Sequence, residues 1–471
     1  MAEFRTHSLF LALLAATACS SAPPAPPLQF QLPDLSGIPE PQLSRWWTMF
    51  GDPDLQDLVD RTLANNQELL AAAARVEESA ALVRNADDLL PLANVRAGVG
   101  RSQTSDRSAF PRFGGIDRRN YSFSVGLDVT YELDLWGRIR AGDRAVLADL
   151  AAQSETAITL ASVLAAQTAQ SYYRLVALDR RLALLRATVE NRTEAVRIQQ
   201  RRLSAGTGSA LELRQVEADL AAVAAQLPRL LAAQASAERA LLVLTGADPR
   251  TIAARQVART TELPAPPAVP ADLPADLLQR RPDLRAAEAR LAAASARVDE
   301  ARARYFPTIR LTGSFGQESK DLSDLFVGPA TIWNLAAGIT QPLFGLRKIA
   351  AQADAATARR AAAEADYVRA VQGSFAETYD ALGYLSATRD TAAAQQRQQE
   401  ALAAAAHIAE LRHGAGAGGF LDLLDARRNL LQVQTARIDT ALEQLTATID
   451  VFRALGGGFD PAPPEPASTT R

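Results

Sequence analysis

The stretch YSFSVGLDVTYELD at residues 121–134 decides the fold class of this chain. Apolar or aromatic residues occupy every odd position from Tyr121 to Leu133, and small, polar or acidic residues occupy every even position. Side chains of a β-strand alternate between the two faces of a sheet. The stretch is therefore predicted to be a long strand with one apolar face and one polar face.

Shorter runs at residues 95–99, 309–315 and 333–339 alternate in the same way and predict two hairpins, 91–134 and 307–344. The expected helices are too long and too few to cover the apolar face, so the strands match a membrane β-barrel wall. Four strands do not close a barrel, and lipid tolerates no open edge. The barrel must be shared: three copies give twelve strands, and two give eight, whose interior is filled by side chains.

Two proline-free windows, residues 112–227 and 343–460, are rich in residues of high helix propensity. We expect helices over residues 54–90, 138–204, 207–245, 276–304, 346–412 and 419–455. A helix over 138–204 would be about 100 Å long, so the protein should be elongated, with two short helices stacked along each long one. Pro228 should distort its helix locally.

The two halves of the chain repeat one another. RLSAGTGSALELRQVEADL at 202–220 and RHGAGAGGFLDLLDARRNL at 412–430 align without gaps at an offset of 210. This brings Gly206 onto Gly416, in glycine-rich turns that permit the left-handed backbone at a helix reversal. The chain is interpreted as a tandem duplication of short helix, hairpin, long helix, turn and short helix.

Composition argues against several functions. Of 471 residues, 22% are charged and 48% hydrophobic, and the net charge of −3 gives no basic footprint for nucleic acid. One cysteine and three histidines leave little for acid–base or zinc chemistry, and we find no Ser/His/Asp set or phosphate loop. After the amino terminus, no segment approaches the ~18 apolar residues of a transmembrane helix. We expect neither an enzyme nor a metal or other cofactor.

The amino terminus has the pattern of an export signal. Arg5 precedes an apolar run over 9–16, and small residues lead into Cys19. This resembles the lipobox of bacterial lipoproteins, whose cysteine is lipidated after cleavage, and Ser20 by resemblance favours the outer membrane. The alternative is a signal that is uncleaved or cleaved elsewhere.

The chain is thus divided into six segments. They are a signal peptide (1–18), a lipid-anchored proline-rich strap (19–53), the first repeat (54–245), a proline-rich linker (246–275), the second repeat (276–455) and a disordered C-terminal tail (456–471). Proline keeps the strap extended.

A series of motifs stands in order on this duplicated frame. They are WWTMFGDPDLQDLV at 46–59, YELDLWGRIRA at 131–141, the two turns quoted above, LLQRRPDLRAAEARL at 277–291, YFPTIRLTGSFG at 305–316 and QPLFGLR at 341–347. With these motifs the chain, over about residues 45–457, resembles the outer-membrane efflux channel family of the TolC and OprM type. The lipoprotein branch, which serves resistance-nodulation-division pumps, is the most similar.

The resemblance implies a passive conduit for drugs or other small toxic solutes. It implies a homotrimer in outer-membrane lipid, with a twelve-stranded barrel and a twelve-helix periplasmic tunnel. The tunnel tips, with Gly206, Thr207, Gly416 and Ala417, would contact a membrane-fusion adaptor that couples them to an inner-membrane pump. The only non-protein group implied is the covalent lipid on Cys19.

The polar face of the strands is expected to line the lumen. The expected lumen residues are Ser122, Ser124, Asp128, Thr130, Thr312 and Ser314, together with Glu132, Asn334 and Thr340. They suit weak, unselective contact with solutes. The alternative is that they only maintain solubility and strand pairing.

A candidate gate lies beside the second turn. Asp422 and Asp425 are three residues apart near a helix start, so they share a face, and three chains would bring six carboxylates toward one axis. The resemblance places the periplasmic gate here. Gly418 and His413 stand where the best-known branch has a basic residue and a tyrosine, which argues against that branch's salt-bridge latch. The alternative is that both aspartates only favour the helix dipole.

Two other function classes stay open. A structural envelope tether would use the anchor and the long helices but would not require alternating strands, so single-channel conductance separates it from a channel. A polypeptide secretion duct shares the scaffold and differs only in the lipobox and the details of the motifs.

Overall fold

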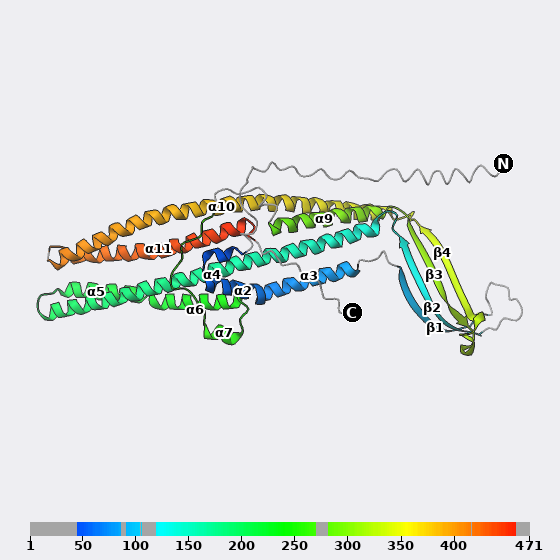
Figure 1. Ribbon diagram of the computed structural model, residues 1–471, viewed down its shortest axis with the longest axis horizontal. Helices are drawn as coiled ribbons and strands as arrows, with labels where there is room; N and C mark the ends of the chain where they lie inside the picture. The colour runs from blue at the N-terminus through cyan, green and yellow to red at the C-terminus, as the bar shows by residue number, and fades with distance from the viewer. Residues whose placement is uncertain are drawn as a thin grey trace.

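The computed structural model describes residues 45–85, 91–103, 105, 119–269, 281–415 and 417–457. The described chain is a long rod of helices, with a four-stranded sheet at one end and two helix reversals at the other (Figure 1). The predicted elongated, mainly helical fold with a β part is confirmed. Across the described ranges, no helix is both long enough and apolar enough to cross a bilayer.

Two very long helices set the length of the rod. α4 (Arg138–Ser204) has 67 residues and α10 (Leu346–Gly414) has 69, about 100 Å each. The shorter helices are α2 (Pro53–Asn65), α3 (Gln67–Asn85), α5 (Ala210–Ala224), α6 (Leu227–Leu244), α7 (Pro249–Ala254), α9 (Pro282–Ala303) and α11 (Phe420–Ala454). α2, α3, α5 and α6 pack along α4, α11 packs along α10, and α9 lies between the long helices. The predicted stacking is confirmed, except that α9 packs on α4 as well as on α10.

The prediction of one helix over residues 54–90 is wrong in one respect. The helix is interrupted at Asn66, which separates α2 from α3. The buried Asn66 side chain donates from Nδ2 to the carbonyl of Leu244 (2.9 Å), at the end of α6. Its Oδ1 accepts from the backbone N–H of Glu68 (2.9 Å) and so caps α3. Pro228 has the predicted effect: it lies in the first turn of α6, where a break separates α6 from α5.

The antiparallel sheet has the order β1-β2-β3-β4. The strands are β1 (Leu92–Gln103), β2 (Arg119–Leu133), β3 (Thr308–Ser319) and β4 (Thr331–Thr340), with the 3₁₀ turns η4 (Leu322–Asp324) and η5 (Gly328–Ala330) between the last two. Leu127 pairs with Val95 and with Phe315, and Phe315 pairs with Trp333. Val95, Phe315 and Trp333 are 80%, 64% and 76% exposed. One apolar face, open in the protomer, is therefore confirmed.

The two central strands approach closely where Gly126 pairs with Gly316. A Cβ on Gly316 would lie 2.4 Å from the carbonyl oxygen of Val125, so only glycine allows this approach. These two positions join the hairpins of the two repeats into one curved sheet (Figure 1).

An equatorial core lies midway along the rod. Its largest members are Trp46, Trp47, Phe50, Tyr172, Tyr173 and Phe452. Trp46 stacks on Phe452 with ring centroids 5.9 Å apart. The Tyr172 hydroxyl donates to Asp52 (2.8 Å) and accepts from the N–H of Thr260 (3.1 Å). The packed chain therefore starts ahead of the boundary predicted at residue 54, because the tryptophans of the first motif belong to this core.

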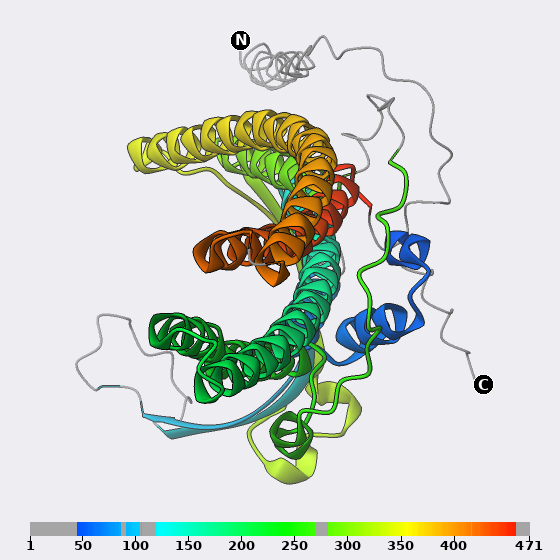
Figure 2. The same cartoon turned by 90° about the vertical axis from the view of Figure 1, so that its left-hand side faces the viewer.

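Viewed from the helical tips, the long helices form a curved layer (Figure 2). The segments that cross the equator, η3 (Trp46–Phe50), α2 and the extended chain over 257–269, lie on its convex side. The predicted signal peptide and the segment 458–471 lie outside the described residues.

Candidate functional site

The strands bring the predicted lumen residues together on one face. Asp128 pairs with Ser314, Ser314 pairs with Asn334, and Thr130 pairs with Thr312. This face also carries charge, because Arg96 lies 3.6 Å from Asp128 as an ion pair. The sheet thus separates an apolar surface from a polar, charged one.

The two helix reversals are built alike. After α4, the N–H of Thr207 donates to the carbonyl of Arg202 (2.9 Å), and after α10, the N–H of Ala417 donates to that of Arg412 (2.8 Å). The pairs are related by the offset of 210, so the duplication extends to individual hydrogen bonds. Gly206 has φ +70, as the turn chemistry predicts.

Gly208 and Gly418, which are also related by the offset of 210, do not have a positive φ. A Cβ at either position would meet the preceding helix, at 2.8 Å from the Leu203 nitrogen or 3.0 Å from the Arg412 Cβ. They are glycines because the backbone reverses tightly. Gly416 lies outside the described residues, as does Cys19.

Asp422 and Asp425 lie on the first turns of α11, and both are exposed. A Cβ on Gly419 would lie 3.2 Å from Asp422 Oδ2, so this carboxylate folds back toward the helix N-terminus. Asp425 is 69% exposed and lies 3.6 Å from Arg428. His413 packs against the Phe420 ring at 5.3 Å between centroids. The tip of α11 thus presents two exposed carboxylates, of which Asp425 is paired with Arg428.

A buried ion cluster close to the tips was missed by the sequence reasoning. Asp219 of α5 is 2% exposed and Arg192 of α4 is 5% exposed. Arg192 Nε lies 2.8 Å from Asp219 Oδ2, as an ion pair without hydrogen-bond alignment. Arg428 Nε of α11 donates to Asp219 Oδ1 at 2.9 Å. Asp219 therefore ties the α4–α5 hairpin to α11 of the second hairpin.

The electrostatics of this cluster follow from its burial. Desolvation lowers the pKa of the Arg192 guanidinium, and the Asp219 carboxylate opposes that shift. A charge this deep requires its partner, since a buried unpaired charge costs several kcal/mol. One feature of the sequence could have revealed this cluster. Asp219 stands three residues after Val216 and four before Val223, so it lies on the buried face of α5.

With this geometry established, comparison with known proteins identifies the family. Residues 58–247 and 273–457 match the profile of the family described as Outer membrane efflux protein. The chain belongs to this family. It is therefore an outer-membrane efflux channel and not an enzyme.

Individual outer membrane efflux proteins are similar over nearly the whole chain. The pyoverdine export outer membrane protein OpmQ of Pseudomonas aeruginosa is 32% identical over 467 residues, covering 97% of this chain and 98% of the relative. The outer membrane protein OprJ of the same species is 34% identical over 426 residues, covering 88% and 86%. The solved structure of the outer-membrane channel OprN has a TM-score of 0.82 at 30% identity and covers 92% of this chain and 99% of that one.

Proposed function

We propose that three copies of this chain form the exit duct of a tripartite efflux pump, through which small toxic solutes pass passively from periplasm to exterior. The four-stranded sheet carries the proposal, because its apolar face suits lipid and its polar face suits a wet lumen. β1 and β4 are the ends of the strand order, so each protomer has two open edges. Three copies joined edge to edge give twelve strands and leave no edge in lipid.

The helices support a periplasmic tunnel. Their length carries the two turns about 100 Å from the sheet, far beyond the membrane that the sheet enters. The turns, with Thr207 and Ala417, are the proposed contacts of a membrane-fusion adaptor, which couples the tunnel to an inner-membrane pump, most simply of the resistance-nodulation-division type. Family membership supports both partners.

The scaffold tolerates very different cargo. Relatives of this chain are named for pyoverdine export, for toluene efflux and for cation efflux. A conduit that makes weak, unselective contacts explains this range, because the pump selects the solute and supplies the energy.

We propose a closed gate at the tips, formed by three copies of Asp422 and Asp425. In planar bilayers the wild-type trimer should conduct, prefer cations and be blocked from the tip side by multivalent cations, because like charges concentrate in a narrow opening. The variant with Asp422→Ala and Asp425→Ala should lose the block and shift toward neutral selectivity. The measurements are reversal potential and block by hexamminecobalt(III).

These outcomes separate the conduit from its gate. A wild-type trimer that does not conduct would contradict the exit duct. A conducting double variant whose block is unaltered would remove both aspartates from the gate and leave them as stabilisers of the α11 N-terminus. Glu217→Ala, which removes a half-buried carboxylate of α5 that pairs with Arg214, is the charge control.

We also propose that Cys19 is lipidated and anchors the mature protein to the outer membrane. Each buried methylene of an acyl chain contributes ~0.8 kcal/mol to membrane retention. Intact mass should show a chain that begins at Cys19 with the added mass of acyl groups. Cys19→Ser should lose that mass yet keep membrane trimers, because the barrel holds them. An unlipidated wild-type chain cleaved elsewhere would contradict the anchor.

A further inference from the structure

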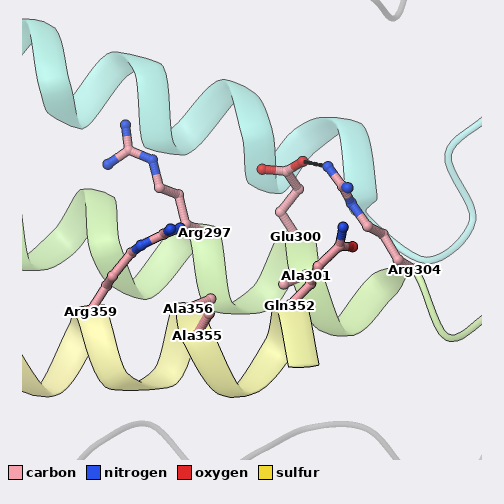
Figure 3. Close-up of a pocket in the computed structure, with 8 residues that line it drawn as sticks. All are labelled: Arg297, Glu300, Ala301, Arg304, Gln352, Ala355, Ala356 and Arg359. Atoms are coloured by element: carbon pink, nitrogen blue, oxygen red, sulfur yellow. Dashed lines mark hydrogen bonds and ion pairs between the residues drawn. The ribbon is translucent and has the colours of Figure 1, made fainter. Parts of the chain in front are cut away.

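A basic groove is lined by residues of α9 and α10 (Figure 3), at the end of the rod that joins the sheet (Figure 1). Its volume is about 360 Å³, within the range of small-ligand sites. Arg297 and Arg304 line it from α9, and Gln352 and Arg359 line it from α10. The members of each pair are seven residues apart, so each helix presents one row to the groove.

The arginine row of α9 also contacts α4. Arg297 pairs with Asp149 of α4, and Arg290, seven residues before it, donates to Thr156 (2.7 Å), seven residues after Asp149. That row of α4 continues through Gln170, and Tyr172 is two residues further on, about 200° around the helix. Tyr172 packs into the equatorial core, whose segments η3 and α2 lie on the convex side (Figure 2), so the row of α4 that meets α9 turns away from that side.

The groove has unused capacity for negative charge. Its lining carries three guanidinium groups against the single carboxylate of Glu300, which binds Arg304 at 2.8 Å. Arg359 is exposed and has no hydrogen-bond or ion-pair partner within the described chain. A guanidinium offers five N–H donors, so Arg297 and Arg304 also keep donors free after binding one carboxylate each. Helix packing explains Arg297 and Arg304 but leaves Arg359 without a role.

We infer that this groove binds the anionic group of a solute in transit: a carboxylate, sulfonate or phosphate. The inference rests on the proposed function and places the groove on the conduit side of the helical layer. Guanidinium forks match the geometry of such groups. Three copies place three grooves around the conduit, at the opposite end of the rod from Asp422 and Asp425. That separation far exceeds a Debye length of about 8 Å, so the acidic tips do not cancel the site.

The test measures binding of naphthalene-1,5-disulfonate to the detergent-solubilised trimer by equilibrium dialysis. The wild-type trimer should bind the dianion reversibly and with low affinity. This affinity should fall further as the salt concentration rises. Arg359→Gln should weaken binding about fivefold or more, and Arg359→Glu should abolish it. Because Arg359 is exposed and unpaired, both variants should still form trimers that conduct in potassium chloride.

Arg389→Gln is the matched control, since Arg389 is also an exposed residue of α10 but lies outside the groove. It should change binding less than twofold. Equal losses in both variants would indicate a diffuse field and contradict a site, as would dianion binding that survives Arg359→Glu. A wild-type channel that does not conduct would contradict the proposed function, whereas a conducting channel that binds no dianion would contradict only the groove.

Discussion

Leu335→Asp is expected to keep the protein out of the outer membrane, whereas Asn334→Asp, one residue earlier, is expected to leave insertion intact. Leu335 is 78% exposed on the apolar face of β4. Asn334 lies on the opposite face, paired with Ser314. A charge that faces lipid costs up to a few kcal/mol near the bilayer centre, and a trimer carries three of them. On the polar face the same carboxylate stays in water.

The measurement is the amount of heat-resistant trimer in the outer-membrane fraction, compared with total chain. Asn334→Asp is nearly isosteric, so the pair differs mainly in the face that receives the charge. Equal loss in the two variants would mean that the assignment of the faces to lipid and lumen is wrong. Equal tolerance would mean that the apolar face does not meet lipid.

The sheet was predictable because its signal is local. A strand needs only its own alternation to define two faces, and residues 121–134 supply it over their whole length. The bounds of α4 followed for the same reason, since helix propensity accumulates along a proline-free window. The pairing within each hairpin then follows, and Leu127 opposite Phe315 of the other hairpin agrees with the predicted faces.

Features that depend on distant residues were not predictable. The break at Asn66 depends on a carbonyl at Leu244, far along the chain. The tryptophans of the first motif were recognised as part of a motif, yet Phe452, on which Trp46 stacks, lies near the other end of the sequence. The groove around Arg359 exists only because α9 and α10 run side by side. Sequence periodicity gives the face of a helix but not the neighbour that this face meets.

The cluster around Asp219 shows the functional consequence of such distant contacts. Glu410 and Arg427 pair α10 with α11, and Arg192 and Asp219 pair α4 with α5, so each hairpin has its own ion pair. Of the ion pairs in this cluster, the one between Asp219 and Arg428 joins one hairpin to the other. Any widening of the tips that separates the hairpins must break it.

Asp219→Ala is therefore expected to loosen the tips. It leaves Arg192 buried without its carboxylate, at a cost of about 3–5 kcal/mol, and frees Arg428. Spin labels at Thr207 and Ala417 should report a broader and longer distance distribution by pulsed electron paramagnetic resonance. Channel conductance should rise in parallel. Glu217→Ala is again the control, because its ion pair with Arg214, whose side chain is 78% exposed, contributes at most about 1 kcal/mol.

A second variant separates lost stability from the lost tie between hairpins. Arg192→Met combined with Asp219→Leu replaces the buried ion pair with apolar packing, which is often neutral or stabilising. It should restore the thermal stability of the trimer but not the narrow distance distribution, because Arg428 still lacks its partner on α5. Narrow distributions and unchanged conductance in both variants would show that the hairpins are held by the rest of their packing. Recovery of both stability and narrow distances in the double variant would assign Asp219 to folding alone.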